Sequence, residues 1–288
     1  MSPTARFLWA ALLLLPGGCA LENSLIYQPS QYPRGDWSPV GPTLEDAHFA
    51  SADGTKLHGW YVSHPRPRAV VLFAHGNAGN LSDRWPVVRL LNERLGVSVL
   101  AFDYRGYGRS EGQPNERGIL ADARAARDWL ARREGIAPED VVLLGRSLGG
   151  GVMVDLAARD GARGLILEST FTSLPDVAAK QFPWLPVGWI MHNRLDSLSK
   201  IGDYQGPLLQ SHGAADQLIP LKDGRRLHAA APGRKRFVTI PDADHNWVWT
   251  PEYVAALNDF LLSLPSPRSG DSAPSRHAYP QAGRANGS

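Results

Sequence analysis

The sequence predicts an α/β domain built on a mostly parallel central sheet with helices on both of its faces. Three observations lead to this class. Apolar strand-like runs alternate with amphipathic helical stretches, the runs are apolar throughout, and one of them passes through a glycine-rich turn directly into a helix. The 288 residues, with 43% hydrophobic and 20% charged side chains, are typical of a folded globular protein.

The predicted domain spans residues 44–264 and begins with a hairpin. Residues 47–51 and 57–62 flank Asp53-Gly54, which is a hairpin turn signal. The strand-like runs that follow are residues 69–74, 97–102, 141–145, 165–167, 208–210 and 237–240. The helical stretches between and after them are residues 83–95, 116–133, 152–158 and 251–262. This order predicts a parallel sheet that carries antiparallel strands at one edge.

The first 20 residues have the pattern of an export signal. A short positive region precedes an apolar run at residues 7–15 that is too short to span a bilayer. Residues 15–19 resemble a bacterial lipoprotein signal, in which Cys19 becomes the lipidated first residue, whereas ordinary cleavage after Ala20 would remove it. The first alternative predicts a membrane-anchored lipoprotein of the cell envelope, and the second predicts a soluble periplasmic or secreted protein.

Two further segments lie outside the predicted domain. Residues 21–43 are rich in Pro, Gln and Ser and are expected to form a spacer between membrane anchor and domain. Residues 265–288 have almost no apolar periodicity, so they cannot bury enough surface to offset their ordering entropy and are expected to be a disordered tail. The net charge of +2 and the scattered arginines argue against a nucleic-acid partner. No cysteine–histidine cluster is present, so the sequence predicts no metal site and no cofactor.

The most informative stretch is the Gly-x-Ser-x-Gly pattern at residues 145–149. It follows an apolar strand and precedes a helix, which is the context of a nucleophile elbow that holds Ser147 above the edge of a sheet. Glycine is needed at both ends of the pattern because a Cβ there would collide with the neighbouring strand or helix. The alternative is a glycine-rich connection without chemistry.

A serine hydroxyl needs a base within hydrogen-bond reach, and catalytic groups gather at the carboxyl ends of parallel strands. Asp216 lies in the loop after the strand at 208–210, and His245 lies in the loop after the last strand. The order serine, aspartate, histidine along the chain is that of the α/β-hydrolase superfamily. Glu168, which also follows a strand, is the alternative acid.

Five motifs between about residues 70 and 250 make a more specific resemblance. They are His75–Asn80, Asp103–Ser110, the serine turn, His212-Gly213 with Asp216, and Asp244-His245-Asn246. Together they resemble an α/β-hydrolase serine hydrolase of the short-lid branch, which includes monoacylglycerol-lipase-like and protein-depalmitoylase-like enzymes. The resemblance implies the α/β-hydrolase fold with a short lid insertion at about residues 170–200. It also implies that Ser147 attacks an acyl carbonyl, His245 takes the serine proton and Asp216 orients the imidazole.

The resemblance assigns the oxyanion hole to the backbone amides of Asn77 and Leu148. A backbone donor would leave the Asn77 side chain free, so its position matters more than its identity. His75 and His212 are expected to be structural hydrogen-bonding residues beside the site. Arg146 is expected to lie on the surface or in a salt bridge, with contact to an anionic leaving group as the alternative.

The predicted lid contains an aromatic and apolar patch broken by prolines. Phe171, Trp184 and Trp189 are the side chains expected to contact an apolar acyl group. The alternative is that these side chains pack on the core as part of a connecting helix.

The predicted function is hydrolysis of a carboxylic ester or thioester of an apolar small-molecule or lipid acyl substrate, through an acyl-enzyme on Ser147. A peptidase or an acyltransferase could use the same triad, because the motifs define the acyl-enzyme and not its donor or acceptor. A different class is a surface-anchored binding module that keeps the fold without turnover. The presence of nucleophile, base, acid and both oxyanion positions argues against that class.

Overall fold

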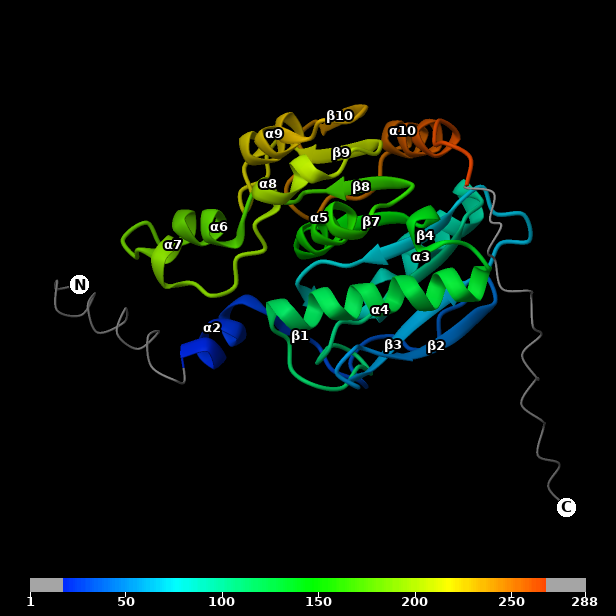
Figure 1. Ribbon diagram of the computed structural model, residues 1–288, viewed down its shortest axis with the longest axis horizontal. Helices are drawn as coiled ribbons and strands as arrows, with labels where there is room; N and C mark the ends of the chain where they lie inside the picture. Colours follow the sequence, from blue (N-terminus) through cyan, green and yellow to red (C-terminus); the bar gives the residue numbers. More distant parts are fainter. Residues whose placement is uncertain (1–17, 268–288) are drawn as a thin grey trace, which may run out of the picture.

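The computed structural model describes residues 18–267 and confirms the predicted sheet (Figure 1). Eight strands are arranged in the order β10-β9-β8-β7-β4-β6-β3-β2. Their bounds are β2 Leu44–Ala50, β3 Lys56–Val62, β4 Val70–Ala74, β6 Ser98–Phe102, β7 Val142–Arg146, β8 Gly164–Glu168, β9 Leu208–Gly213 and β10 Lys235–Ile240. The six neighbouring strands β10, β9, β8, β7, β4 and β6 are parallel. At the other edge, β3 pairs antiparallel with β6, and β2 and β3 form the expected antiparallel hairpin.

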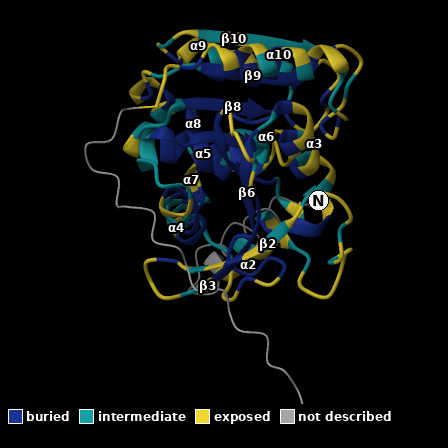
Figure 2. Cartoon of the chain, turned by 90° about the vertical axis from the view of Figure 1, so that its right-hand side faces the viewer, coloured by how far each residue is buried: buried dark blue, intermediate teal, exposed yellow. Residues whose placement is uncertain are grey.

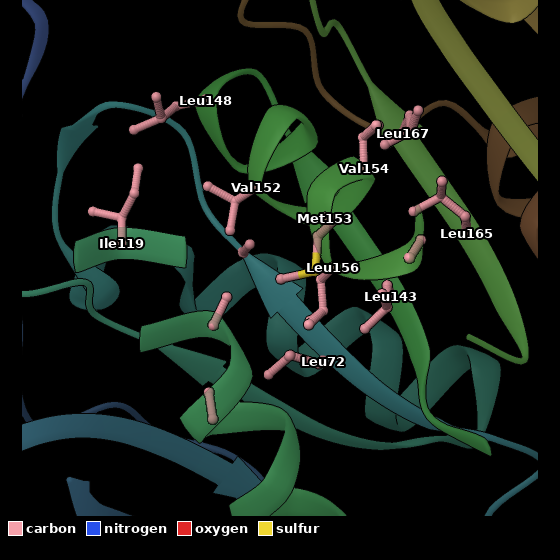
Figure 3. Close-up of a cluster of buried hydrophobic side chains, with 14 of the residues drawn as sticks. Leu72, Ile119, Leu143, Leu148, Val152, Met153, Val154, Leu156, Leu165 and Leu167 are labelled. Atoms are coloured by element: carbon pink, nitrogen blue, oxygen red, sulfur yellow. The ribbon is translucent and has the colours of Figure 1, made fainter. Parts of the chain in front are cut away.

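Helices cover both faces of the sheet because successive strand residues point to opposite sides. Leu72 of β4 packs into the core with α4 and α5, whereas its neighbours Val71 and Phe73 pack into the core with α3 and α10. The main helices are α3 Trp85–Leu95, α4 Glu116–Glu134, α5 Leu148–Asp160, α9 Leu221–Ala230 and α10 Pro251–Leu262. Figure 3 shows the leucine and valine side chains between α5 and the sheet, and Figure 2 shows the buried strands between the more exposed outer helices. The sheet is therefore held by two separate cores.

The longest helix, α4, shows how the local sequence sets an element. Asn115 caps its first turn by accepting a hydrogen bond from the Gly118 amide, and Gly135 ends it in the left-handed conformation at φ 68°. The buried residues between these ends recur every three or four positions, which gives the helix one apolar face. They include Ile119, Ala123, Ala126 and Leu130. That face packs against the sheet beside α5.

The chain between β8 and β9 forms the insertion expected as a lid. It contains α6 Leu174–Gln181, α7 Val187–Ile190, α8 Ser197–Lys200 and the 3-10 helix η3 Ile201–Asp203. Two other 3-10 helices are η1 Leu81–Arg84, directly before α3, and η2 Pro138–Asp140, before β7. The insertion lies at the left of Figure 1, where α6 and α7 project beyond the sheet.

The segment expected as a spacer is packed against the domain instead. Its helix α2, Gly18–Ile26, is followed by β1, Gln28–Pro29, which pairs in parallel with β5, Ala78–Gly79. Glu22 and Tyr27 are buried, so their side chains belong to the folded domain. Composition alone misses this docking because a few specific hydrogen bonds hold the segment, which is rich in polar residues.

The predicted export signal and tail fall mainly on residues 1–17 and 268–288, which lie outside the described residues. Within residues 18–267, no helix combines the length and the apolar character needed to cross a bilayer.

Candidate active site

Ser147 lies in the tight turn between β7 and α5 and has the backbone angles φ 52° and ψ −115°. A positive φ is rare for a residue with a side chain and is a form of stored strain typical of functional turns. The turn closes because Gly145 and Gly149 carry no Cβ. An added Cβ would overlap the backbone of Gly149 in the first case and the carbonyl oxygen of Ala74 in the second.

The structure brings the three predicted catalytic residues together at the carboxyl ends of their strands. His245 Nε2 lies 2.9 Å from Ser147 Oγ, and His245 Nδ1 lies 2.8 Å from Asp216 Oδ2. The two residues beyond the serine are almost covered, with exposed fractions of 9% for His245 and 5% for Asp216. Serine, imidazole and carboxylate thus form one continuous chain of hydrogen bonds, as general-base activation of a hydroxyl requires.

The loop around Asp216 fixes the direction of its carboxylate. Its second oxygen, Oδ1, accepts hydrogen bonds from the amides of Leu218 at 3.0 Å and Ile219 at 2.8 Å. Burial raises the pKa of Asp216, but hydrogen bonds from His212, His245 and the Ile219 amide outweigh it and hold the pKa well below its ordinary value. Asp216 is therefore ionised at neutral pH and can stabilise an imidazolium.

Two further side chains hold the loops that carry the acid and the base. His212 is fully buried, with Nε2 2.7 Å from the Ile219 carbonyl oxygen and 3.3 Å from Asp216 Oδ2. Asp244 Oδ1 accepts from the amides of His245 at 2.7 Å and Gln217 at 3.0 Å, which ties the two loops together. These amide bonds lower the pKa of Asp244. His212 thus has the structural role that the sequence suggests for it.

Glu168, the alternative acid, is directed away from His245. Tyr253 donates its hydroxyl hydrogen to Glu168 Oε1 at 2.8 Å, and desolvation raises the pKa of this buried carboxyl. The backbone carbonyl oxygen of Glu168 accepts a hydrogen bond from the Ser147 amide at 2.8 Å. Glu168 therefore supports the serine turn through its backbone, and Asp216 is the acid in contact with His245.

Arg146 differs from its sequence-based interpretation as a salt-bridged or surface residue. Its Nη2 donates to the carbonyl oxygens of Trp247 at 2.9 Å and His245 at 3.5 Å, and its guanidinium lies 5.7 Å from the centre of the Trp247 ring. No carboxylate oxygen within residues 18–267 lies within 4.0 Å of it. Arg146 therefore links the serine turn to the loop that carries His245.

The two amides expected to form the oxyanion hole belong to segments that adjoin Ser147. A Cβ built on Gly76, beside Asn77, would lie 3.5 Å from the Ser147 Cβ, so the loop after β4 packs directly on the serine. Leu148 is the first residue of α5, where helix amides have no partner inside the helix. Neither the Asn77 nor the Leu148 amide donates a hydrogen bond to another group within residues 18–267. Both remain available to a ligand.

The side chain of Asn77 is not free, contrary to the expectation. Its Oδ1 accepts hydrogen bonds from the Gln28 amide at 3.1 Å and the Tyr107 hydroxyl at 3.0 Å, and its Nδ2 donates to the Ile26 carbonyl oxygen. The amide group thus joins the loop after β4 to the N-terminal segment. Sequence reasoning missed this role because two of the partners lie in a segment it assigned to a spacer.

We call residues 18–30 the N-terminal strap because they bridge the loop after β4 and the end of the lid. At the lid, the Glu22 carboxylate accepts hydrogen bonds from the amides of His192 at 3.0 Å and Asn193 at 2.7 Å, and from Asn193 Nδ2 at 3.0 Å. Burial raises the pKa of Glu22, but these hydrogen bonds outweigh it and leave the pKa below its ordinary value. The strap is thus fastened by an ionised carboxylate at one end and by Asn77 at the other.

A cavity of about 880 Å³ opens over Ser147 and His245. The strap contributes Glu22, Leu25, Ile26 and Gln28 to its walls. The lid contributes a larger, mainly apolar set: Phe171, Leu174, Val177, Ala178, Gln181, Phe182, Leu185, Val187, Ile190 and Met191. Within residues 18–267, no group of three or more side chains is arranged to hold a metal ion.

Of the three predicted lid contacts, only Phe171 lines the cavity. Trp184 and Trp189 do not line it, and Trp189 is 94% exposed. In the short helix α7, Val187 and Ile190 face inward, whereas Trp189 follows Val187 by two positions and lies roughly 200° around the axis. Two aromatic residues of the cavity lining, Phe182 and Trp247, were not singled out by sequence reasoning.

Comparison with known proteins agrees with this architecture. The profile of the alpha/beta hydrolase fold family matches residues 69–191. An uncharacterized protein of Mycobacterium tuberculosis is 40% identical over 227 residues, which cover 78% of this chain and 80% of the relative. The alpha/beta hydrolase domain-containing protein WAV2 of Arabidopsis thaliana is 32% identical over 255 residues, covering 80% and 83% of the two chains. The chain therefore belongs to the α/β-hydrolase superfamily.

Solved structures show the same fold at lower sequence identity. An esterase of Pyrococcus furiosus superposes with a TM-score of 0.66 at 22% identity, covering 83% of this chain and 98% of that one. Acetyl xylan esterase 1 from Thermoanaerobacterium gives a TM-score of 0.56 at 20% identity, covering 80% and 86%.

Proposed function

We propose that this protein is a serine hydrolase that cleaves carboxylic esters or thioesters with an apolar acyl group. One observation carries the proposal: the hydrogen-bonded chain Ser147–His245–Asp216 opens directly into a largely apolar cavity. The esterases among the structural neighbours support it as well.

In the proposed reaction, Ser147 Oγ attacks the acyl carbonyl while His245 Nε2 takes its proton, and Asp216 stabilises the imidazolium. The developing oxyanion accepts hydrogen bonds from the Asn77 and Leu148 amides. His245 then gives the proton to the leaving alcohol or thiol, which leaves an acyl group on Ser147. Water attacks that acyl-enzyme in a second, equivalent step. A peptide or a second alcohol in place of these groups would make the protein a peptidase or an acyltransferase.

Turnover on p-nitrophenyl esters of increasing acyl length, with the full chain and Ser147→Ala in parallel, tests the proposal. We expect hydrolysis with an optimum at intermediate or long chains, and its loss by several orders of magnitude in Ser147→Ala. A fluorophosphonate probe should label the native chain and not the variant. An absence of both turnover and labelling would contradict the proposal and favour a binding module.

We also propose that the chain is exported and anchored as a lipoprotein through Cys19. The support is the signal-like sequence that ends at this cysteine. Mass spectrometry of the mature protein tests the proposal, with a diacylglyceryl-modified Cys19 as the expected N-terminus. An unmodified Leu21 at the N-terminus would instead identify ordinary signal-peptide cleavage and a soluble protein.

A further inference from the structure

The cavity has walls of two different kinds on the two sides of Ser147. The sheet order β8-β7-β4 puts the serine, at the end of β7, between the lid that follows β8 and the loop and η1 helix that follow β4. The lid side is mainly apolar and suits the acyl chain. The side beyond the oxyanion loop is polar, and two arginines, Arg84 of η1 and Arg146, contribute to the cavity lining.

Neither arginine has an anionic partner within residues 18–267 at 4.0 Å or less. Arg84 Nη2 donates to the Ala78 carbonyl oxygen, but its buried Nε has no hydrogen-bond partner among the described residues. Arg146 uses Nη2 for the carbonyl oxygens of the loop that carries His245. Carbonyl oxygens thus hold the two guanidinium groups in place without a direct ion pair.

The nearby acids are bonded to other groups, although Asp103, whose charge raises the pKa of Arg84, has one oxygen, Oδ2, without a hydrogen-bond partner among the described residues. Of the acids that line the same cavity, Glu22 is bound by the lid amides, and Asp83 Oδ2 accepts the Asn80 amide at 3.1 Å in the cap of η1. Glu168 lies near Arg146 but accepts a hydrogen bond from Tyr253; burial raises its pKa, and the charge of Arg146 offsets part of this rise.

Two positive charges beside one partly buried cavity repel each other. Burial lowers the pKa of Arg84, Asp83 offsets part of this, and the charge of Arg146 lowers the pKa further. A ligand anion between the guanidinium groups would relieve the repulsion and satisfy the free donors. Guanidinium groups bind carboxylate and phosphate oxygens well because their donors lie in one plane.

We propose that the polar side of the cavity binds an anionic group on the leaving alcohol. The substrate class is then an acyl ester whose alcohol bears a carboxylate or a phosphate. This inference rests on the proposed hydrolase function and adds the identity of the leaving group. Water supplies the atoms that complete the reaction: the acyl C–O bond breaks, the alcohol leaves with the proton from His245, and the acid is released from Ser147.

Matched esters test the proposal on the full chain. 3-(Acyloxy)benzoate and 3-(acyloxy)benzamide carry the same acyl group and have the same shape, but only the first is anionic. 3-(Acyloxy)phenyl phosphate forms a third arm that distinguishes phosphate from carboxylate. We expect kcat/KM of at least one anionic ester to exceed that of the amide about tenfold at low salt, with the ratio falling as salt is added.

Arg84→Gln should bring that ratio close to one. Arg89→Gln is the matched control, because Arg89 lies on α3 outside the cavity and pairs with Glu93 at 2.9 Å. The control should keep the native ratio. Because each ratio compares substrates on one protein sample, partial unfolding of a variant cancels from it. A native ratio of one or below, or an unchanged ratio in Arg84→Gln, would overturn the proposal.

Binding separates this inference from the proposed function. Calorimetry on Ser147→Ala measures the affinity for each intact ester without turnover. Tighter binding of an anionic ester than of the amide, lost in the double variant with Arg84→Gln, supports the anion site even if no ester is hydrolysed. Equal affinities would overturn the anion site while leaving ester hydrolysis by the native chain unaffected.

Discussion

The floor of the cavity and its walls are built in different ways. The floor consists of the serine turn and the loops after β9 and β10, where backbone segments meet so closely that Gly145 and Gly149 cannot carry a Cβ. The walls consist of the N-terminal strap and the lid, which meet through a few hydrogen bonds between segments about 170 residues apart. Close packing at this sheet edge leaves little freedom for the backbone of the floor. The walls are held by fewer contacts, and Asn77 connects the strap to the loop beside Ser147.

The largest loss of activity should come from a substitution in the floor. In Asp216→Asn the imidazole loses its charged partner and adopts the wrong tautomer, so we expect kcat to fall about 10⁴-fold. Steady-state kinetics on the preferred p-nitrophenyl ester measures this. Glu168→Gln is the control, because Glu168 has no contact with His245. A larger loss of kcat in the control than in Asp216→Asn would identify Glu168 as the acid.

Asn77→Ala tests the hydrogen bonds that connect the loop beside Ser147 to the strap. The backbone donor stays in place but loses the side-chain bonds that orient its loop, so we expect kcat to fall about 10- to 100-fold, less than removal of an oxyanion donor would cost. Asn92→Ala is the control, since Asn92 is a buried asparagine that also bonds backbone carbonyls but lies on α3. It should lower the melting temperature and leave kcat close to native. Equal effects on kcat would assign Asn77 a purely structural role.

A substitution in the wall should lower the free energy of unfolding, by an amount that depends on pH. The Glu22 carboxylate accepts buried amide hydrogen bonds, so Glu22→Gln should cost about 1–3 kcal/mol of unfolding free energy near neutral pH. Because the folded-state pKa of Glu22 is lowered, its contribution is present above the unfolded pKa of about 4.3 and is lost as pH falls through the folded value.

Urea unfolding of the native chain and Glu22→Gln from pH 7 to pH 3 measures that contribution. The difference between them should shrink at the acidic end. Glu45→Gln, at an exposed pair with Arg133, is the control and should change stability little at any pH. A difference that persists unchanged to pH 3 would mean that the Glu22 charge does not fasten the strap.

The smallest loss of activity is expected in the lid, where a residue that faces the cavity is compared with one that faces outward. Phe182→Ser removes a side chain that lines the cavity, so we expect a several-fold loss of kcat/KM for long acyl esters and little change for short ones. Trp189→Ser removes a side chain that points outward, and it should leave the chain-length preference unchanged for soluble esters. A larger shift from Trp189 than from Phe182 would contradict the assigned orientation of the lid.

The loops that meet in the floor were predictable from the sequence. The positions of Ser147, Asp216 and His245 follow from a general property of parallel sheets, whose strand ends meet at one edge. The sheet itself was predictable because its strands are continuous apolar runs. The helix α9 was missed because it is short and contains Gly224, a residue that would ordinarily weaken a helix. In the structure that glycine leaves room for the buried ring of His212.

The walls were beyond sequence reasoning for a physical reason. The role of Asn77 depends on amide and carbonyl groups of a segment 49 to 51 residues away, and polar backbone contacts leave no periodic signal. Likewise, whether a tryptophan of the lid faces in or out depends on the rotation of the four-residue helix α7. Such a helix is too short for an apolar pattern to define its buried side.

The strap has a consequence for how the enzyme would meet its substrates. Glu22, which is fastened to the lid, follows Cys19 by only three residues, or roughly 5 Å of helix rise. If Cys19 carries the lipid, almost no slack separates the anchor from the cavity wall. Such an enzyme would search in two dimensions, and the relevant substrate concentration would be the number of molecules per area of lipid rather than per volume. Its rate would then depend on how molecules spread within the bilayer surface to which it is attached.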